Sequence, residues 1–343
     1  MEILFGFYGK RGSNTVPDAA REFHLAQMQL LFCYNSEMRR VPDPRYEREV
    51  EAAQDAGFIC HLLGFEDFID GLEEQSLEFV RPASHEVLLY RGFMFRDWEY
   101  RKLEAALRMR GYALFTQPDA YAEAHYLPNH YAKIAHLTPP AAWSEGKNLA
   151  AAWRAARTLG DGPWIVKDYV KSAKQKWDSA CFIPQDVDRP VFERICLNLL
   201  EYQGERFERG FVFRQFKPLK RIGESPYGYP LNEEYRLFFF RRQLLVAAPY
   251  DREGGNETDF SRFGEIAQSF RSEFITIDVA KAEDGSWLII EVGDGGVSLL
   301  PPLIDPTMFY RALRARLDAP KADSAPGFTV TPAGAWPHRI HGS

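Results

Sequence analysis

Apolar runs of strand length alternate with amphipathic helices from Met28 to about residue 135. The clearest strand is QLLFCY at 29–34, and a helix that begins near Pro44 ends at Gly57, where a glycine is typical of a helix end. Because strands separated by helices usually pair in parallel, this part predicts a small α/β layer with a parallel sheet. Further strands are predicted at 58–63, 86–95 and 112–115, and a second helix at 96–110.

The pattern changes at Pro139 and Pro140, which prevent a helix from running through and mark a linker at 136–147. A helix is predicted at 148–158, and the chain then becomes rich in strands, with one helix at 188–203 between them. This half therefore has the pattern of an α+β fold with antiparallel sheets. The strands are predicted at 164–170, 210–216, 234–240, 244–248, 274–280 and 287–292, and a closing helix at 307–317.

These changes divide the chain into two folded domains with a polar segment at each end. The first segment leaves it open whether the protein starts at Met1 or Met28. The last is rich in Pro, Ala, Gly and Ser and is expected to be disordered. The predicted segments are an extension at 1–27, an N-terminal α/β domain at 28–135, a domain at 136–317 with lobes at about 136–216 and 217–317, and a tail at 318–343.

Length, charge and cysteine content exclude several classes of protein. A chain of 343 residues is too long for one ordinary core, which agrees with two domains. The net charge of −6 argues against nucleic-acid binding through bulk positive charge. Four widely spaced cysteines without a C-x-x-C pair favour thiols in a reducing cytoplasm. We expect no membrane span and no signal peptide, because the apolar runs are too short.

The most informative stretch is FITIDVAKAEDGSWLIIEVGDGG at 274–296. Asp284 and Gly285 predict a two-residue type I′ turn, which places Asp278 directly opposite Glu291. Their β-carbons would lie about 4.5–5.5 Å apart, where two like charges destabilise a hairpin. A divalent cation between them reverses the sign of this interaction. Oxygen ligands with positions left for water and phosphate suit Mg²⁺ bound to a nucleotide.

The same pairing divides the hairpin into an apolar face, expected in the core, and a face that carries the two acids. An exposed face whose acids only aid solubility is the alternative interpretation. The GDGG turn at 293–296 favours a site, because it lets backbone approach a ligand closely, and Asp294 could supply a further oxygen ligand. The predicted apolar face consists of Ile275, Ile277, Val279, Leu288, Ile290 and Val292, and the acids lie beside Phe274, Thr276, Trp287 and Ile289.

Four motifs follow one another in the order found in ATP-grasp ligases, and the region from about 112 to 317 resembles that family. They are WIVKDYVKS, FVFRQFKPL, NEEYRLFFF and an Asp–Glu spacing of thirteen followed by a turn of small residues. The segments HYLPNHY and TPPAAW add to the likeness. The chain is most similar to a bacterial and phage clade marked by an arginine and two lysines. The resemblance implies a small N-terminal α/β layer followed by a two-lobed ATP-grasp fold.

The resemblance also implies roles for individual residues. Lys167 would contact the nucleotide phosphates, and Lys171 would lie near the transferred phosphate. Arg236 would neutralise a phosphate or the acyl intermediate, while Asp278 and Glu291 would hold magnesium. The hinge that receives adenine, mostly through backbone groups, would consist of Gln215, Phe216 and Lys217.

Elementary chemistry supports some of these roles without excluding structural alternatives. On an extended strand Lys167 and Lys171 would point to one side, as two cations facing one polyanion would require. An ordinary exposed basic face is the alternative. Arg236 shares a strand face with Glu234 and Phe238, so it needs an anionic partner, which is either a ligand or a carboxylate such as Glu234. Glu234 could instead reach a ribose or a metal.

Several residues depart from the family pattern or lie outside its motifs. Gly293 stands where most ATP-grasp enzymes have asparagine, which leaves the number of bound metals open. The usual lysine of an earlier strand has only Lys133 as a candidate. His125 and His130 have no zinc-site spacing and are expected to be structural. Arg91, near a strand end, is a candidate substrate contact.

The leading functional hypothesis is an ATP- and Mg²⁺-dependent ligase that activates a carboxylate as an acyl phosphate for attack by an amine. Its substrates would be small-molecule or peptide carboxylates and amines. The segments 171–180 and 251–264 are expected to close over the nucleotide. Phosphoryl transfer without ligation, and a nucleotide-binding protein without turnover, are the alternatives. The pattern leaves the substrates and the oligomeric state open.

Overall fold

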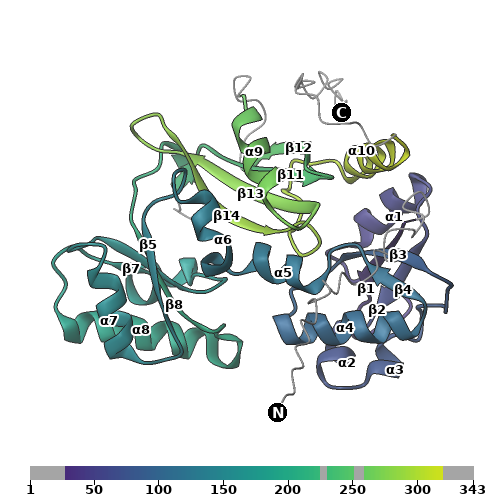
Figure 1. Cartoon of the computed structure of the whole chain (residues 1–343), viewed down its shortest axis with the longest axis horizontal. Coiled ribbons are helices and arrows are strands. Elements are labelled where there is room, and N and C mark those ends of the chain that lie inside the picture. Colours follow the sequence, from purple (N-terminus) through teal and green to yellow (C-terminus); the bar gives the residue numbers. More distant parts are fainter. Residues whose placement is uncertain (1–27, 225–229, 251–258, 320–343) are drawn as a thin grey trace, which may run out of the picture.

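The computed structural model describes residues 28–224, 230–250 and 259–319. An N-terminal layer and a first lobe lie at opposite ends of the molecule, and a second lobe lies above and between them (Figure 1). The extension predicted at 1–27 and nearly all of the tail predicted at 318–343 fall outside the described residues. Within the described ranges, no helix combines the length and the apolar content needed to cross a membrane.

The N-terminal layer is a four-stranded sheet built from β1 (Gln29–Cys33), β2 (Cys60–Leu63), β3 (Glu86–Arg91) and β4 (Tyr112–Leu114). All its strands pair in parallel in the order β2-β1-β3-β4, which confirms the predicted α/β layer. The sequence pattern did not identify α2 and α3, because helices of five and four residues are too short to show a helical period. The helices are α1 (Glu47–Asp55), α2 (Phe65–Ile69), α3 (Glu73–Ser76) and α4 (Asp97–Met109).

Gly111 makes the turn from α4 into β4 possible. Its φ of +86° lies in the left-handed region, which glycine adopts without strain. A β-carbon at this position would lie 1.9 Å from the carbonyl oxygen of Ala83. Only glycine therefore fits, and the helix predicted at 96–110 ends where the sequence indicated.

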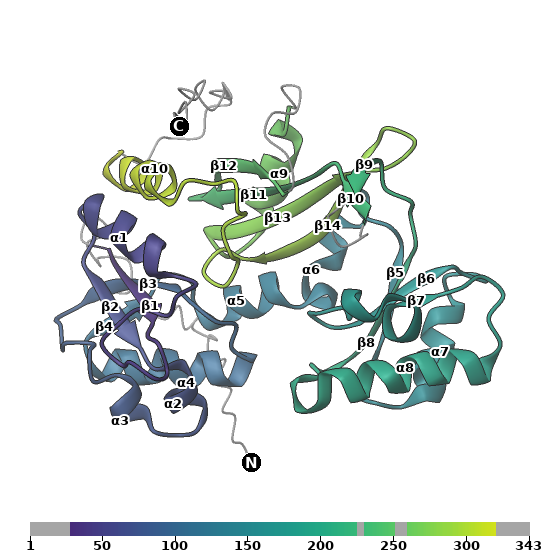
Figure 2. The same ribbon diagram turned by 180° about the vertical axis from the view of Figure 1, so that it is seen from behind.

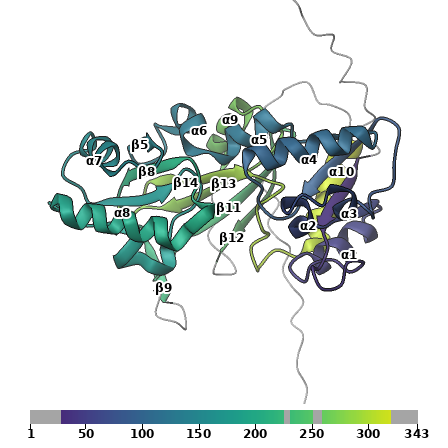
Figure 3. The same cartoon turned by 90° about the horizontal axis from the view of Figure 1, so that it is seen from below.

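Two further helices, α5 (Pro118–His125) and α6 (Leu127–Ile134), connect the N-terminal layer to the lobes. Each has a proline in its first turn, where the missing amide proton is tolerated. Figure 3 shows α4, α5 and α6 following one another along one side of the molecule. The connection is thus helical, and it brings His125 and His130 beneath the second lobe.

The first lobe is a four-stranded antiparallel sheet of β5 (Ala141–Glu145), β6 (Trp164–Asp168), β7 (Phe182–Ile183) and β8 (Gly210–Gln215), in the order β5-β8-β6-β7. The helices α7 (Leu149–Arg157) and α8 (Arg189–Gln203) pack against one face and form a separate core with it. The prediction of a linker at 136–147 is wrong for β5. The proline pair stops a helix, but an extended chain can begin directly after Pro140.

The second lobe is an antiparallel sheet of β11 (Glu234–Phe240), β12 (Gln243–Pro249), β13 (Phe274–Lys281) and β14 (Trp287–Asp294), in the order β12-β11-β13-β14. The helix α9 (Ser261–Ser269) and α6 contribute to the core on one of its faces. A small hairpin of β9 (Arg221–Glu224) and β10 (Pro230–Asn232) lies at the side of this lobe (Figure 2). Part of the predicted covering segment 251–264 belongs to α9, and residues 251–258 lie outside the described residues.

One hydrophobic core joins the N-terminal layer to the second lobe. The closing helix α10 (Pro306–Asp318) packs against α1, and its Phe309, Tyr310 and Leu313 are fully buried. Phe238 and Phe274, from the face of the second-lobe sheet that points away from α9, enter the same cluster. The N-terminal layer and the second lobe are therefore packed together more closely than a division at residue 135 suggests.

Arg91 stabilises this junction from inside the protein. Its guanidinium is 1% exposed and donates to Glu49 Oε2 at 2.6 Å and to the carbonyl oxygens of Gly295 and Ser298 at 2.6 and 2.7 Å. The hydroxyl of Tyr310 donates to the same Glu49 oxygen at 2.6 Å. Arg91 is therefore an interior arginine whose donors go to protein groups, and the expectation that it contacts substrate directly is not supported.

We predict that Arg91→Met lowers the free energy of unfolding by about 3–5 kcal/mol, because it leaves Glu49 buried without its cationic partner. Arg101→Met is the matched control, since Arg101 is 48% exposed and forms only surface ion pairs with Asp97 and Asp119. It should change the free energy by less than about 1 kcal/mol. Urea unfolding of both variants measures the difference, and equal losses would contradict an energetic role for the Arg91 network.

Candidate functional site

Two acids face each other on the second-lobe sheet, as the hairpin pattern predicted. In the register of β13 and β14, Asp278 is paired with Glu291, and Arg236 of β11 is paired with Asp278 from the other side. The three side chains share the sheet face that Phe238 and Phe274 occupy farther along. One end of this face is thus core, and the other end carries charged groups.

The turn of this hairpin differs from the prediction. The amide of Ala282 donates to the carbonyl of Ser286 at 2.8 Å, and the amide of Gly285 donates to the carbonyl of Ala282 at 3.0 Å. The loop therefore contains three residues instead of two, and Gly285 adopts a φ of +84° at its third position. This is the three-residue alternative for a hairpin that contains glycine.

A β-bulge compensates for the longer turn. Val279 pairs with Ile289 while Asp278 pairs with Glu291, so Ile290 is the extra residue. The predicted facing of the acids is therefore correct, but the predicted faces closer to the turn are wrong. Ile289 is buried and Trp287 packs against the core, whereas Leu288 and Ile290 are only partly buried and outside it.

Arg236 and Asp278 form a two-pronged ion pair. Arg236 Nε donates to Asp278 Oδ1 at 2.8 Å, and its Nη2 donates to Asp278 Oδ2 at 2.7 Å. The Tyr250 hydroxyl donates to the same Oδ2 at 2.9 Å, and Arg236 Nη1 donates to the Leu299 carbonyl at 2.8 Å. Of the partners left open by the sequence, the structure selects Asp278 and not Glu234. Burial lowers the pKa of Arg236, but Asp278 raises it more, so it stays above its usual value.

Lysines of the first lobe surround Glu291. Burial raises the pKa of Glu291, but Lys171, Lys167 and Lys174 outweigh it, and the pKa falls to about 2. Burial lowers the pKa of Lys167 to about 8 against the opposing effect of Glu291. The carboxylate and the lysine cations thus influence one another across the junction of the lobes, although they come from different sheets.

The two lysines of the KDYVKS motif converge by a turn and not along a strand. β6 ends at Asp168, whose Oδ1 accepts the amides of Val170 and Lys171 at 2.6 and 2.5 Å. The expectation of one extended strand from Lys167 to Lys171 is therefore wrong. Both ammonium groups still act on Glu291, because the turn returns the chain toward the second lobe.

Glu234 adds a third carboxyl group to this region. Burial, together with the charges of Asp278 and Glu291, raises its pKa to about 7, and Lys174 and Arg236 only partly oppose the shift. A carboxyl group that titrates near neutral pH can accept or release a proton there. The structure thus brings Glu234 together with the two predicted metal ligands.

Asp294 lies elsewhere, although it was predicted as a further oxygen ligand. It pairs with Ile275, one residue out of phase with Thr276 and Asp278, so its side chain is on the opposite face of the sheet. The carboxyl group is 1% exposed, and its Oδ1 accepts the amide of Gly296 at 2.8 Å. Burial raises its pKa to about 7. The structure therefore does not bring Asp294 together with Glu291.

Gly293 is the position on the acidic face where related enzymes have asparagine. Two hydroxyl groups approach it: the Oγ atoms of Thr276 and Ser298 lie 2.8 Å apart, and each would be 3.2 Å from a β-carbon at residue 293. A larger side chain would have to displace this pair. The departure from the family pattern is thus accompanied by a local replacement of polar groups.

The segment predicted as an adenine hinge follows β8 at the junction of the lobes. The amides of Gln215 and Phe216 donate to the carbonyls of Pro140 and Pro163, each at 2.9 Å, so they are engaged within the first lobe. Lys217 is exposed. The Phe216 ring packs against an aromatic pair formed by Phe182 and Trp177, whose centroids are 5.4 Å apart in a stacked arrangement. This pair belongs partly to the segment 171–180, which forms short helical turns.

Sequence reasoning missed two polar residues of this region. Arg214 on β8 donates to the Ile290 carbonyl at 2.6 Å, at the bulge beside Glu291, and thereby links the two lobes. Tyr250, just after β12, holds Asp278. Arg214 lies in the quoted motif FVFRQFKPL, and its place next to Gln215 was the available signal. Tyr250 had none, because its approach depends on the β11–β12 pairing.

The two histidines of HYLPNHY are interior residues near the lysines. Burial lowers the pKa of His125 to about 3 and of His130 to about 4, and Lys167 contributes to both shifts. His125 stacks on Tyr121 with centroids 4.8 Å apart, and His130 Nδ1 is 2.8 Å from the Glu123 carbonyl oxygen. These contacts support the expectation of a structural role. Lys133 is paired with Glu123 at 2.8 Å.

The carboxylates fit a magnesium ion that arrives with a phosphate ligand better than an ion held by protein alone. Among the described residues, no group of three or more His, Cys, Asp and Glu side chains is arranged to hold a metal. Mg²⁺ usually binds one or two carboxylates and completes its octahedron with water and substrate phosphates. Asp278 and Glu291 provide such a pair on neighbouring strands.

Comparison with known proteins identifies the part of the chain that carries this site. The model of an ATP-grasp domain, family 3 of the clade marked by an arginine and two lysines, matches residues 158–313. Residues 158–313 form an ATP-grasp domain. The match confirms the resemblance and the ATP-grasp fold with its antiparallel sheets. No curated protein matches the chain.

Solved structures of ATP-grasp proteins share the fold over most of their length. A RimK domain protein ATP-grasp from Sphaerobacter thermophilus DSM 20745 is 14% identical with a TM-score of 0.54, covering 84% of this chain and 98% of that one. The D-cycloserine synthetase DcsG is 16% identical, with a TM-score of 0.53 and coverages of 85% and 99%. The ATP-grasp ligase PsnB, complexed with a minimal precursor, is 13% identical, with a TM-score of 0.51 and coverages of 85% and 98%. The fold of the chain is therefore that of ATP-grasp ligases.

We predict that Asp294→Asn stabilises the ATP-grasp domain at neutral and alkaline pH. A carboxyl group whose pKa is raised by folding favours stability while it is protonated, so its contribution falls as the pH rises from about 4 to about 7. The variant should remove this loss, and its free energy of unfolding relative to the natural protein should rise by about 2–4 kcal/mol over that range. Urea unfolding at several pH values measures this. A constant difference between the two proteins would contradict the buried acid.

Proposed function

We propose that the protein is an ATP- and Mg²⁺-dependent ligase that activates a carboxylate as an acyl phosphate and joins it to an amine. The observation that carries the proposal is the convergence of charged groups at the junction of the lobes. Glu291 and Asp278 of one sheet face Lys167 and Lys171 of the other, within an ATP-grasp fold. Alternating acids and cations of this kind suit a triphosphate and its metal.

In the proposed reaction an oxygen of the substrate carboxylate attacks the γ-phosphorus of ATP. The new P–O bond forms as the bond to the β,γ-bridging oxygen breaks, and ADP leaves with that electron pair. The amine nitrogen then attacks the acyl carbon, the C–O bond to phosphate breaks, and phosphate departs while the nitrogen loses a proton. No protein nucleophile is needed, so the protein acts by positioning and by charge stabilisation.

The side chains divide this work by charge. We assign Lys167 and Lys171 to the phosphate oxygens, because both are cations of the first lobe that already act on Glu291. Asp278 and Glu291 would hold Mg²⁺, which supplies neutralisation of the triphosphate when bound. Gln215, Phe216 and Lys217 would border adenine, with the Lys217 amide and hinge carbonyls as contacts, since the Gln215 and Phe216 amides are engaged.

Arg236 would exchange partners during this cycle. Its guanidinium compensates Asp278 in the structure, and a metal that neutralised Asp278 would release it to a phosphate or to the acyl intermediate. The charge on the sheet face then stays balanced before and after nucleotide binding. Glu234, whose pKa of about 7 lies near neutrality, would be the nearby group able to take up the proton of the amine.

We predict that Glu291→Gln removes the benefit of Mg²⁺ for nucleotide binding. In the natural protein, Mg²⁺ should tighten ATP binding at least about tenfold, and in the variant it should have little effect, because one of two metal-binding carboxylates is gone. The release of ADP with carboxylate and amine mixtures should fall about 100-fold or more. Calorimetry of ATP binding with and without Mg²⁺ and an ADP-release assay measure both effects.

Glu283→Gln is the matched control, because Glu283 is exposed at the turn of the same hairpin. Asp294→Asn is a second control, because its carboxyl group lies on the opposite face. Both should keep the Mg²⁺ effect. A natural protein that binds no Mg-ATP would refute the proposal, and a stable phosphorylated product without an amide would identify a phosphotransferase instead.

We predict a loss of ATP affinity as the pH rises through about 8. Burial lowers the pKa of Lys167 to about 8, and only its ammonium form attracts phosphate, so the Kd should rise by up to about tenfold per pH unit above that value. In Lys167→Arg the guanidinium stays charged, and the Kd should change little between about pH 8 and about pH 9.5. Calorimetry across this range compares the two slopes, and parallel slopes would exclude Lys167 as the titrating group.

A further inference from the structure

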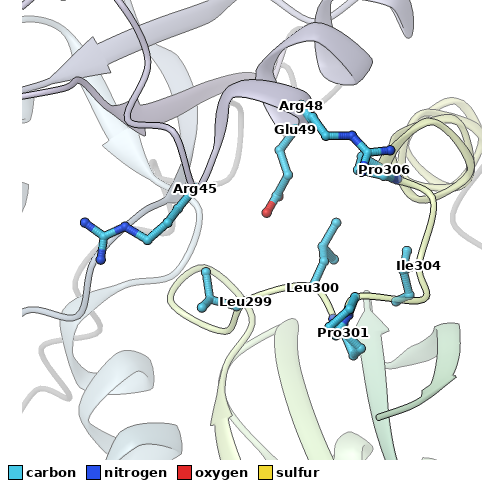
Figure 4. Close-up of a pocket in the computed structure, with 9 residues that line it drawn as sticks. Arg45, Arg48, Glu49, Leu299, Leu300, Pro301, Ile304 and Pro306 are labelled. Carbon is cyan, nitrogen blue, oxygen red and sulfur yellow. The ribbon is translucent and has the colours of Figure 1, made fainter. Parts of the chain in front are cut away.

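A pocket of about 210 Å³ lies between the N-terminal layer and the chain that follows β14 (Figure 4). The residues before and at the start of α1 form one side of it, and the segment from Leu299 to Pro306 forms the other. It lies outside the nucleotide site described above. The lining residues are Arg45, Arg48, Glu49, Leu299, Leu300, Pro301, Pro302, Ile304 and Pro306.

The charged groups of the pocket include one guanidinium without an assigned partner. Arg45 is paired with Asp43 at 2.9 Å and lies 3.9 Å from the centroid of the Phe93 ring. Arg48 is exposed, and no described residue forms a hydrogen bond or ion pair with it. Figure 4 places Arg48 at the rim beside Pro306, at the end of the pocket away from Arg45. An anionic group of a ligand would satisfy it.

Glu49 presents a carboxylate to the middle of the pocket (Figure 4). One of its oxygens, Oε2, accepts from Arg91 and from the Tyr310 hydroxyl, each at 2.6 Å. The acid is therefore fixed in place and its charge is balanced from behind. A carboxylate held in this way can accept a hydrogen bond from an ammonium group without repelling a nearby anion strongly.

The opposite wall is apolar and leads to the nucleotide site. Leu299, Leu300 and Ile304 supply its side chains. Leu299 is 47% exposed, and its carbonyl accepts Arg236 Nη1 at 2.8 Å. One residue thus lines the pocket with its side chain and holds the proposed catalytic arginine with its backbone.

We infer that this pocket binds the amine substrate, and that this substrate is an α-amino acid with an apolar side chain. Its carboxylate would pair with Arg48, its ammonium group would approach Glu49, and its side chain would pack on Leu299 and Leu300. The amine, after losing its proton, would then attack an acyl phosphate held near Arg236. This assignment rests on the proposed function for the reaction, but not for the binding.

The volume supports a ligand of this size. Sites for drug-sized molecules usually measure about 300–1,000 Å³, so a pocket of 210 Å³ is too small for a nucleotide and suits an amino acid. The charged groups at the rim and centre and the apolar wall match the three parts of such a molecule. An uncharged apolar ligand would leave Arg48 without an anion.

The experiment measures binding of L-leucine to the full chain by calorimetry, without nucleotide and again with saturating Mg-ADP. L-leucinamide, which lacks the carboxylate, and 4-methylpentanoate, which lacks the amine, are the matched probes. L-valine, L-methionine and L-phenylalanine extend the panel. We expect at least one amino acid to bind, and both analogues of L-leucine to bind about tenfold more weakly than L-leucine itself.

Arg48→Gln should raise the Kd of the bound amino acid about tenfold, which corresponds to about 1.4 kcal/mol, without changing the Kd of L-leucinamide. Arg311→Gln is the control, because Arg311 is an exposed arginine of α10 outside the pocket. It should bind like the natural protein. A thermal midpoint within experimental error of the natural protein shows that each variant is folded.

Two results would overturn the inference: no amino acid of the panel binds in either condition, or Arg48→Gln and Arg311→Gln have equal effects. Failure of Mg-ADP to bind would refute the proposed nucleotide site instead, and the arm without nucleotide would still test the pocket. Binding of both analogues as tight as that of L-leucine would also exclude an amino-acid pocket, because it would show that neither charged group is recognised.

Discussion

The mutual compensation of carboxylates and cations at the lobe junction is the interaction on which the rest of the site depends. Asp278, Glu291 and Glu234 share one end of a sheet face, where three like charges would repel one another. Two opposite charges about 4 Å apart at an effective dielectric of about 20 attract by about 4 kcal/mol. Arg236 from within the sheet, and lysines from the first lobe, provide this attraction. Without them the acids could not remain ionised in a partly buried place.

The compensation is shared between two bodies with different cores. The N-terminal layer and the second lobe are joined by one apolar cluster and by the buried Arg91–Glu49 pair. The core formed by α7, α8 and the first-lobe sheet is separate from it. Contacts between the lobes include the Arg214 bond to the Ile290 carbonyl and the lysine charges around Glu291. Charge, more than a common core, therefore connects the lysines to the acids, and a triphosphate between them would strengthen that connection.

The sequence predicted the parts of the fold that are set by local periodicity. Asp278 opposite Glu291, the parallel N-terminal layer and the helix ends at Gly57 and Gly111 all follow from strand alternation and turn chemistry. The bulge at Ile290 could not be predicted, because a three-residue turn and a bulge together give the same pairing at the acids as a two-residue turn without one. Other parts depend on tertiary contacts that leave no periodic signal. Lys171 converges on Glu291 only because Asp168 caps a turn through its side chain.

The position of Arg236 explains how one residue can serve the site both before and after nucleotide binding. In the structure two of its donors hold Asp278, and a third holds the carbonyl of Leu299, on the wall of the neighbouring pocket. If a cation takes over the charge of Asp278, the guanidinium loses its strongest partner but keeps the tether to Leu299. It would then remain between the nucleotide and the pocket, where a new negative charge would develop. The ion pair thus keeps the acids stable and places the arginine for chemistry, and these two requirements do not conflict.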